Sequence, residues 1–552
     1  MIEFKELSIN DKTLYNEYIH ADSERGCEVS FTNLFMWGLQ KIAYLHDHVI
    51  LHSKFDDLSF YPFPIGNGEK QAVLDAILND AKERNLSLCI TGLNETNKEV
   101  MEKLYPEQFY YHADRKNYDY VYNIHDLADL KGRKLHRKRN HLKHFKKNHP
   151  DYQVEPISSS NIEDVRAFIF EWYKNKEENH PESDYHHEQA ALEKALAHFE
   201  ELGMEGLLLK EYGKTLAFTM ASQMSPDTLD VHYEKAYGDI DGAYTTINSE
   251  FANYIRNKHP HIQYLNREED MGISGLRKAK MSYFPHHLVK KYKAYPLKYK
   301  YSYKKPDMDM LPALRELWKE AFSDTDAFLD QFYSTAFDVN RCRVATTNNK
   351  LASVLYWFDC KIDEQPVAYI YAVATAKEFR GNGACHMLLK DTHNHLKELG
   401  YKSVMLVPGS ETLIHLYEGC EYELCTKHTK LECSAENMDI SISEISKEEF
   451  ALLRLEYLPK SSVLQEKENL DFLETQAKFY KGENFLLVAH IENENLYGIE
   501  LLGDSSFAPG ILYALNCKDG TFYIPGKDDS FAMYHSLSDD AIEPTYFGFA
   551  FD

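Results

Sequence analysis

Short apolar runs and longer amphipathic stretches alternate along the first half of the chain. Residues 41–53 and 87–93 contain strand-length apolar runs, and residues 71–84 repeat apolar positions at helical spacing. Residues 206–236 hold three further strand-like runs, and residues 242–258 return to the helical period. This alternation predicts a mixed α/β architecture rather than an all-helical or an all-β one.

The second half repeats the alternation after a break. Residues 295–308 contain two prolines, several lysines and no periodicity, which marks a domain boundary. Residues 310–322 place Leu311, Leu314 and Leu317 on one helical face. Three strand-like runs then lead to a loop that contains two glycines: 343–348, 351–359 and 367–375.

The length also argues for several domains. A chain of 552 residues is too long to fold around one hydrophobic core, because a typical domain has ~150 residues. A second change in composition falls near residues 433–440. We predict an α/β fold class with mixed sheets, in a multidomain chain that ends in a small α/β tail domain. The four predicted parts are 1–125, 126–297, 306–432 and 441–552.

Composition narrows the class of protein. Hydrophobic residues make up 43% and aromatic residues 13% of the chain, which is enough for several packed cores. A net charge of −25 disfavours non-specific nucleic-acid binding by the surface as a whole. The nine cysteines form no CxxC pair, and no apolar run approaches the ~20 residues of a membrane span. We therefore expect a reduced, cytoplasmic chain without a signal peptide or transmembrane segment.

The loop with two glycines carries the clearest chemistry. It reads FRGNGACHMLL over residues 379–389, between a β-branched, aromatic strand and an amphipathic helix that ends at Gly400. Gly381 and Gly383 allow the backbone to approach a pyrophosphate, the free amides at the helix start attract anions, and Arg380 adds a cation. An ordinary glycine turn is the alternative interpretation of this loop.

This stretch resembles the acetyl-CoA-binding motif R/Q-x-x-G-x-G/A of the GNAT acyltransferases. The matching residues are Arg380, Gly381, Asn382, Gly383, Ala384 and Cys385, with cysteine where the family usually has glycine or alanine. Residues 401–423 resemble the next strand and helix of the family, whose signature is L-Y-E-x-x-G-[FY]. Glu421 replaces the usual glycine after that helix, and Gly419 comes two residues earlier. The resemblance covers residues 306–432, with 311–322 as the first helix.

The GNAT resemblance implies a fold, a co-substrate and a set of roles. Acetyl-CoA is the expected acyl donor. Backbone groups near Ala372 and Val373 would bind the pantetheine and polarise the thioester carbonyl. Tyr417 matches the tyrosine that protonates the departing thiolate. The general base and the amine acceptor stay open.

A strongly basic stretch in the first half suggests a second site. Residues 131–147 contain nine Lys and Arg side chains in a chain of net charge −25. Such a run repels itself unless something neutralises it, so it predicts an anion site. A solvated basic helix is the alternative. Further cations follow the acidic group 268–270, where pairing within the fold is the simpler explanation: Arg277, Lys278 and Lys280.

Residues 1–295 resemble the DUF2156 family, which is related to the catalytic domain of phosphatidylglycerol lysyltransferase. The segments 132–145, 231–251 and 266–285 carry this resemblance. It implies two tandem GNAT-like units, related to transferases that take an aminoacyl group from tRNA. Aminoacyl-tRNA or a phosphorylated small molecule is the expected partner, and a lipid acceptor is not favoured without a membrane span. The predicted anion-binding residues are Arg137, Lys138, Arg139, Asn140, Arg277 and Lys280. Other residues that match the family are Glu234, Asn266, Arg267 and Asp270.

Other catalytic motifs are missing from the sequence. The histidines near residue 140 and the YHHE stretch lack HExxH spacing, so we predict no metal. There is no GxSxG, Walker A or dinucleotide motif. The chain is thus predicted to be an acyltransferase that acetylates an unidentified amine. The alternative is a non-catalytic, regulatory module that binds CoA or another anion.

Overall fold

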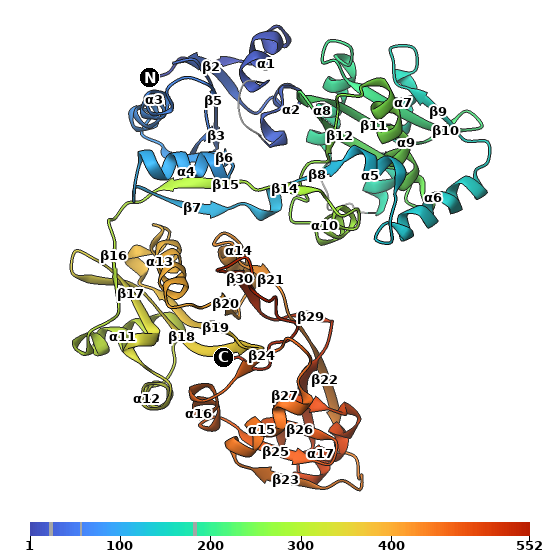
Figure 1. Ribbon diagram of the computed structural model, residues 1–552. Helices are drawn as coiled ribbons and strands as arrows, with labels where there is room; N and C mark the ends of the chain where they lie inside the picture. Colours follow the sequence, from blue (N-terminus) through green and yellow to red (C-terminus); the bar gives the residue numbers. More distant parts are fainter. Residues whose placement is uncertain (21–25, 56–57, 180–184, 552) are drawn as a thin grey trace. The chain divides into compact units, whose positions relative to one another are not determined.

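The computed structural model describes residues 1–20, 26–55, 58–179 and 185–551. The chain divides into two compact units, Met1–Pro296 and Leu297–Asp552, and each unit contains two β-sheets with helices (Figure 1). This confirms the predicted mixed α/β class.

The first sheet of the N-terminal unit has the strand order β1-β2-β3-β4-β6-β15-β7, with β5 paired to β3. Its strands are β1 (Lys5–Glu6), β2 (Lys41–Leu45), β3 (His48–Phe55), β4 (Leu58–Pro62), β5 (Ile65–Gly66), β6 (Ser87–Leu93), β7 (Phe109–Ala113) and β15 (Tyr292–Pro296). Its helices are α1 (Lys12–His20), α2 (Phe31–Trp37), α3 (Lys70–Glu83) and α4 (Glu95–Leu104). Strand β15 comes from the end of the unit, so the two sheets of this unit are interleaved in the sequence.

The second sheet has the order β14-β8-β13-β12-β11-β10-β9. Its strands are β8 (Asp119–Asn123), β9 (Gln153–Pro156), β10 (Glu205–Glu211), β11 (Lys214–Ser225), β12 (Thr228–Ala236), β13 (Tyr264–Asn266) and β14 (His287–Val289). Its helices are α5 (Ile124–Asp129), α6 (His136–Asn148), α7 (Ile162–Asn179), α8 (His186–Ala197), α9 (Ala243–Lys258) and α10 (Ser274–Met281). The basic stretch forms α6, which begins a few residues after the first cations.

The third sheet opens the C-terminal unit and has the order β16-β17-β18-β19-β20-β30-β21, with β24 paired to β18. Its strands are β16 (Ser302–Lys304), β17 (Cys342–Thr347), β18 (Lys350–Ile362), β19 (Gln365–Thr375), β20 (Ser403–Leu406), β21 (Glu423–Leu424), β24 (Val463–Gln465) and β30 (Met533–Ser536). Its helices are α11 (Leu311–Phe322), α12 (Asp326–Thr335), α13 (Ala384–Glu398) and α14 (Glu411–Glu418).

The fourth sheet belongs to the tail and has the order β23-β25-β26-β27-β28-β22-β29. Its strands are β22 (Lys427–Ser434), β23 (Ile442–Ile445), β25 (Lys478–Gly482), β26 (Phe485–Glu492), β27 (Asn495–Gly503), β28 (Asp519–Pro525) and β29 (Asp529–Ser530). Its helices are α15 (Lys447–Tyr457), α16 (Glu468–Glu474) and α17 (Ala508–Ala514).

All four sheets contain the same local connection. In each, one parallel pair of strands is joined through a helix: β4 and β6 by α3, β12 and β13 by α9, β19 and β20 by α13, and β27 and β28 by α17. The strands before each helix are antiparallel neighbours. In the third sheet, this connection places the loop of residues 379–384 between the carboxyl end of β19, an inner strand, and the start of α13.

The end of the chain is tied to the third sheet without forming a strand of its own. Tyr546 forms one isolated bridge with Ser462, and residues 547–551 belong to no helix or strand. Gln465 holds both the amide and the carbonyl of Phe549, at 3.3 and 2.7 Å. Tyr371 of β19 donates a hydrogen bond to the carbonyl of Phe551 at 2.7 Å. Backbone contacts to side chains replace the strand pairing.

A buried ion pair anchors the same segment. Arg454 and Glu500 are each 1% exposed and form two hydrogen bonds, Nε to Oε2 at 2.8 Å and Nη2 to Oε1 at 2.9 Å. Tyr546 donates to the same carboxylate at 3.2 Å. A Cβ on Gly548 would lie 2.1 Å from Glu500 Oε1, so only glycine fits over the pair.

Removal of one partner of this pair should be strongly destabilising. We expect Glu500→Ala to lower the free energy of unfolding by ~3–5 kcal/mol, because Arg454 would stay buried without a counter-ion. Urea denaturation measures the change. Glu444→Ala, which breaks an exposed pair with Lys478 in the same sheet, is the control and should change stability little. Equal effects of the two substitutions would contradict the anchoring role.

Candidate functional site

The glycine loop has the backbone geometry that its sequence suggests. Strand β19 ends at Thr375, a short 3-10 turn covers Lys377–Phe379, and α13 starts at Ala384. Gly381 and Gly383 have φ angles of 70° and 78°, in the region that favours glycine. Gly383 is the N-cap residue and has no side chain to cover the first amides of α13. The helix start is therefore suited to an anionic ligand.

Polar contacts hold the loop in place. Arg380 Nε donates to the carbonyl of Thr375 at 2.8 Å, and its guanidinium lies 3.7 Å from Glu320 of α11. Glu320 also accepts a hydrogen bond from the amide of Lys377 at 2.8 Å. The carbonyl of Asn382 accepts a hydrogen bond from Tyr301 at 3.2 Å. Arg380 is half-exposed, so its charge lies at the loop surface.

Strand β19 is distorted at Ala372, one of the two residues that are predicted to bind pantetheine through their backbone. Ala372 has a φ angle of 47°, and the register between β18 and β19 shifts between Val354 and Tyr356. This is a β-bulge, which interrupts the strand pairing and turns backbone groups outward. Beyond the bulge, β19 no longer pairs with β20, because their parallel pairing covers only Val367–Tyr369. The backbone at Ala372 and Val373 therefore lies where these two strands have separated.

Tyr417 lies on α14 and is 7% exposed. It packs in one apolar cluster with Leu388 and Leu389 of α13, and Val373 and Cys385 border the same cluster. The structure thus brings Tyr417 together with the bulge and the start of α13. Burial raises the pKa of Cys385 to about 12, so a neutral thiol stands at the first turn of α13.

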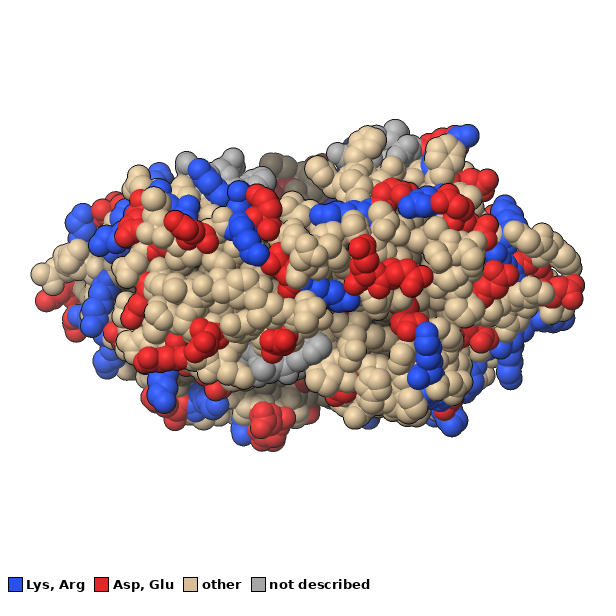
Figure 2. All heavy atoms as spheres, turned by 90° about the horizontal axis from the view of Figure 1, so that it is seen from above, with Lys and Arg blue, Asp and Glu red and all other residues tan. Residues whose placement is uncertain are grey.

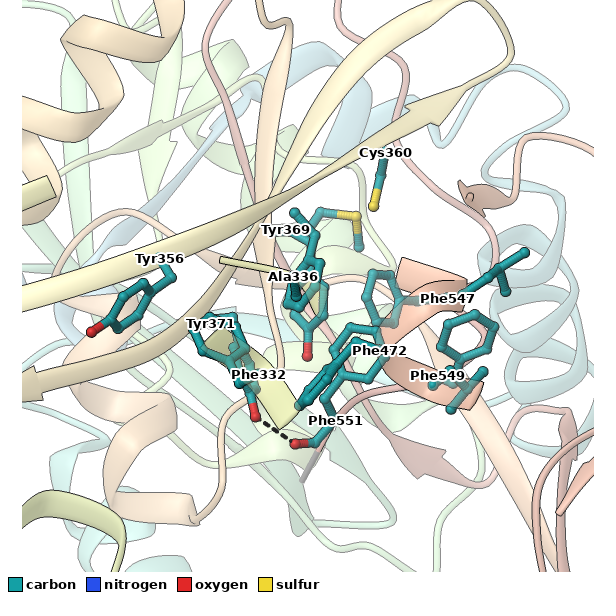
Figure 3. Close-up of a cluster of buried hydrophobic side chains, with 14 of the residues drawn as sticks. Phe332, Ala336, Tyr356, Cys360, Tyr369, Tyr371, Phe472, Phe547, Phe549 and Phe551 are labelled. Atoms are coloured by element: carbon teal, nitrogen blue, oxygen red, sulfur yellow. Dashed lines mark hydrogen bonds between the residues drawn. The ribbon is translucent and has the colours of Figure 1, made fainter. Parts of the chain in front are cut away.

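The other face of this sheet carries an aromatic cluster that the sequence analysis missed (Figure 3). Phe332 of α12 lies 5.3 Å from Tyr356 and 5.8 Å from Tyr371, measured between ring centroids. Phe551 closes the cluster at 5.9 Å from Tyr371. The residues come from four separate segments, so only the aromatic character of the last residues hinted at this packing.

The predicted anion-binding residues of α6 have different environments. Arg137 and Asn140 are exposed. Arg139 donates to the carbonyls of Leu130 and Gly132, and so fastens the preceding turn. Lys138 is half-buried, with its Nζ 3.8 Å from the ring centroid of Tyr283. Burial, helped by the nearby positive charge of Arg267, lowers the pKa of Lys138 to about 8.

Lys138 faces a group of residues that match the family motifs. Arg267 stacks 4.9 Å from the ring centroid of Tyr283, and its Nη2 donates to Glu234 at 2.7 Å. Lys280 is 9% exposed and donates to the backbone carbonyls of Arg267 and Glu268. Burial, and then the charge of Arg267, lowers the pKa of Lys280. Lys138 and Arg267 thus share one aromatic ring, and the Nζ of Lys280 lies 5.8 Å from the ring centroid of Tyr120.

The other family-matching residues serve the fold. Arg277 forms a two-fold contact with the buried Asp270, Nε to Oδ2 at 2.8 Å and Nη2 to Oδ1 at 3.2 Å. Asn266 donates to the buried Asp119 at 2.9 Å. Because its charge is paired internally, Arg277 is less suited to an external anion than Lys138.

Carboxyl groups gather beside the Lys280 site. Lys291 lies 2.6 Å from Asp119 and 2.5 Å from Glu28, and Cys27 Sγ lies 3.0 Å from Glu269. Burial raises the pKa of Cys27 well above its ordinary value, so this thiol is not an activated nucleophile. Burial also raises the pKa of Glu269, against the opposing charge of Lys291.

The surplus of acidic residues does not form one large patch on the face shown in Figure 2. Acidic and basic side chains are interspersed there among the residues drawn in colour. A local cationic group such as that around Lys138 is therefore compatible with a net charge of −25.

Two protein families match this chain. The family "Phosphatidylglycerol lysyltransferase, C-terminal" matches residues 22–295, and the family "Acetyltransferase (GNAT) domain" matches residues 302–425.

Within the described part of the chain, every helix is too short or too polar to cross a membrane.

Three individual proteins are similar to parts of this chain. A conserved protein of unknown function from Bacteroides thetaiotaomicron is 37% identical, with a TM-score of 0.51, and the match covers 54% of this chain and all of that one. The C-terminal domain (DUF2156) of a putative lysylphosphatidylglycerol synthetase from Agrobacterium fabrum is 12% identical, with a TM-score of 0.41, over 56% of this chain and 96% of that one. An uncharacterised protein of Mycoplasmoides gallisepticum is 22% identical over 175 residues, 32% of this chain. The match spans about half of that relative, 54% of its length.

Proposed function

Because this chain belongs in residues 22–295 to the phosphatidylglycerol lysyltransferase C-terminal family and carries an acetyltransferase (GNAT) domain in residues 302–425, we propose that it is an acyltransferase with two transfer sites. The C-terminal site acetylates an amine with acetyl-CoA. The N-terminal site handles an aminoacyl group. The observation that carries the proposal is the loop of residues 380–385, where two left-handed glycines precede a long helix beside a bulged strand.

The C-terminal site divides the reaction among the loop, the bulge and Tyr417. The amides at the start of α13 and the Arg380 side chain bind the pyrophosphate. The backbone at Ala372 and Val373 orients the thioester, whose carbonyl carbon the amine nitrogen attacks. The C–S bond breaks, Tyr417 gives its proton to the leaving thiolate, and water takes the proton lost by the amine.

Turnover distinguishes this proposal from a non-catalytic CoA-binding module. The full-length protein is incubated with acetyl-CoA and a panel of primary amines, and free CoA thiol is followed with a colorimetric reagent. Acceptor-dependent CoA release is the expected result. Binding of acetyl-CoA without release across polyamines, amino sugars and lysine-containing peptides would favour the regulatory module.

The N-terminal site is proposed from its local charge. Lys138 and Arg267 stack on Tyr283, and the buried Lys280 donates to the carbonyl of Arg267, in a chain of net charge −25. The cations can bind a phosphate or a carbonyl oxygen of a ligand. The aromatic ring beside them can contact the face of its nucleobase or sugar. Aminoacyl-tRNA is the proposed donor, since the family is named for lysyl transfer. A phosphorylated small molecule is the second candidate.

Filter binding of bulk tRNA to the full-length protein tests the donor. If phosphate contacts dominate, log K falls linearly with log salt by ~0.7–0.9 per contact. The double substitution Arg137→Ala with Lys138→Ala should reduce the steepness of this slope by the share of about two phosphate contacts. Lys143→Ala with Lys147→Ala removes the same charge from the same helix and is the matched control. Equal slopes for both variants, or no binding at low salt, would remove the proposed tRNA site.

The low pKa of Lys138 predicts a pH dependence. A lysine whose pKa is about 8 carries its charge below that pH and loses it above, so anion affinity should fall as the pH rises. We expect tRNA binding to weaken between about pH 7 and about pH 9, where an ordinary lysine stays charged. In Lys138→Gln, binding should be weak throughout and nearly independent of pH. A wild-type profile that is flat over this range would exclude Lys138 from the contact.

A further inference from the structure

Three side chains meet where the second sheet faces the segment after β13. Asp230 and His232 are two residues apart on β12, so they project from the same face of the strand. Strand β13 runs parallel to β12, with Asn266 opposite Asp230, and this register brings Glu268 to the same place. Ligand atoms of Asp230, His232 and Glu268 all lie within 4.8 Å of one another.

The imidazole of His232 is oriented by a hydroxyl chain. Ser222 donates its proton to Thr32 at 2.8 Å, so at 2.8 Å from His232 Nε2 it can only accept. In the neutral ring, the lone pair is then on Nδ1. That atom faces Glu268 Oε1 and Asn33 Oδ1 at 3.2 Å each, and Asp230 Oδ2 at 3.6 Å. Asn33 Nδ2 donates to both carboxylates, at 2.9 Å to Glu268 Oε1 and at 3.3 Å to Asp230 Oδ2. The Asn33 amide thus borders the place where the imidazole nitrogen and the two carboxylates meet.

A second observation points to a missing positive partner. Asp230 is 0% exposed, and its Oδ1 has no hydrogen-bond partner among the described residues. A buried carboxylate oxygen without a partner is costly. A cation beside Oδ1 would remove that cost.

The charges nearby do not supply that cation. Five carboxyl groups lie in this region: Glu28, Asp119, Asp230, Glu268 and Glu269. Lys291 pairs with Glu28 and Asp119, and the Nζ of Lys280 contacts backbone carbonyls. Among the described residues, neither Asp230 nor Glu268 forms an ion pair with a lysine or an arginine.

We propose that Asp230, His232 and Glu268 bind one divalent transition-metal ion. One imidazole nitrogen and two carboxylates form a donor set that suits Zn²⁺, Mn²⁺ or Fe²⁺. Ser222 and Thr32 serve as outer partners that fix the tautomer of His232. The side chain of Glu268 is 23% exposed, which gives the ion an approach from solvent.

The proposed ion has a structural consequence for its surroundings. Glu268 follows Arg267, and its backbone carbonyl accepts from Lys280 at 3.3 Å. A metal bound to Glu268 would hold this segment against β12, and with it the backbone that supports Lys280. Cys27, whose Sγ lies within 4.8 Å of ligand atoms of Glu268 and Glu269, borders the site.

The experiment uses full-length protein without a histidine tag, stripped with a chelator and dialysed. Titration calorimetry with Zn²⁺ or Mn²⁺, and elemental analysis after removal of free metal, should show about one equivalent per chain. Asp230→Asn and His232→Gln keep size and polarity, and each should weaken binding ~100-fold or more. Ser222→Ala should weaken it ~10–100-fold by releasing the imidazole. His149→Ala removes a histidine that contacts Glu211 elsewhere in this unit, and should change nothing.

A thermal-shift measurement keeps the test informative if a variant folds poorly. Metal should raise the melting temperature of the wild type and of His149→Ala, and leave Asp230→Asn unchanged. Substoichiometric binding by the wild type, or equal binding by Asp230→Asn and His232→Gln, overturns the proposal. Stabilisation by lysine methyl ester but not by any of the metals, lost in Asp230→Asn, also overturns it, because the cluster would then hold an ammonium group.

Discussion

Gly383→Glu should abolish binding of acetyl-CoA to the full-length protein. Gly383 has a φ angle of 78° and caps α13 without a side chain. A glutamate there would strain the backbone and place its own carboxylate at the helix amides, where the pyrophosphate is proposed to bind. Calorimetry should show a measurable heat for the wild type and none for the variant at millimolar acetyl-CoA.

Gly400→Glu is the matched control. Gly400 follows the other end of the same helix and has a φ angle of 91°, and a Cβ added to it would meet no described atom within 4 Å apart from its chain neighbours. The substitution therefore adds the same charge and a similar backbone strain, away from the proposed site. If both variants lost binding, general damage to α13 would explain the result. If Gly383→Glu still bound acetyl-CoA, the loop would not be the pyrophosphate site.

The phosphate loop could be predicted because all its signals are local. Two glycines, a cation and the first turn of a helix lie within seven residues, from Arg380 to His386. The structure gives both glycines left-handed angles and starts α13 at Ala384. The proposed pantetheine position near Ala372 and Val373 came only from the family resemblance. The bulge there was not predicted, since no property of an alanine indicates a positive φ.

The basic helix shows where local reasoning becomes insufficient. Nine cations within residues 131–147 predicted an anion site, but their sequence spacing does not reveal which of them already have partners within the fold. Arg139 caps the preceding turn, whereas Lys138 lies against Tyr283, 145 residues later in the chain. The distinction depends on a tertiary contact that no helical period contains.

The Asp230 cluster could not be found from spacing at all. The expectation of no metal rested on local histidine patterns, and His232 is not part of one. The side chains that contact His232 are Asn33, Ser222 and Glu268. The pairing of β11, β12 and β13 brings Ser222 and Glu268 to it, and Asn33 comes from α2. The only signal in the sequence was the alternation of Asp230, His232 and Glu234 along one face of a strand. This alternation indicates a buried polar face.

Tyr417→Phe should lower kcat ~100-fold while leaving the Kd of acetyl-CoA nearly unchanged. Tyr417 is 7% exposed and packs beside Leu388, Leu389 and Tyr422, so phenylalanine keeps the packing and removes only the hydroxyl. Without that proton donor, the thiolate must leave as an anion in a largely apolar environment. CoA release with the best acceptor of the amine panel measures kcat, and calorimetry measures the Kd.

Tyr422→Phe separates proton transfer from packing. Tyr422 is buried, lies 5.8 Å from Tyr417 between ring centroids, and shares a 2.8 Å hydrogen bond with His393. Its hydroxyl is thus hydrogen-bonded within the fold. Removal of this hydroxyl should change kcat only a few-fold, because only one hydrogen bond near the site is lost. Equal losses in both variants would assign the effect to packing of the cluster. An unchanged kcat in Tyr417→Phe would remove this tyrosine from the proposed mechanism and leave protonation of the thiolate to solvent.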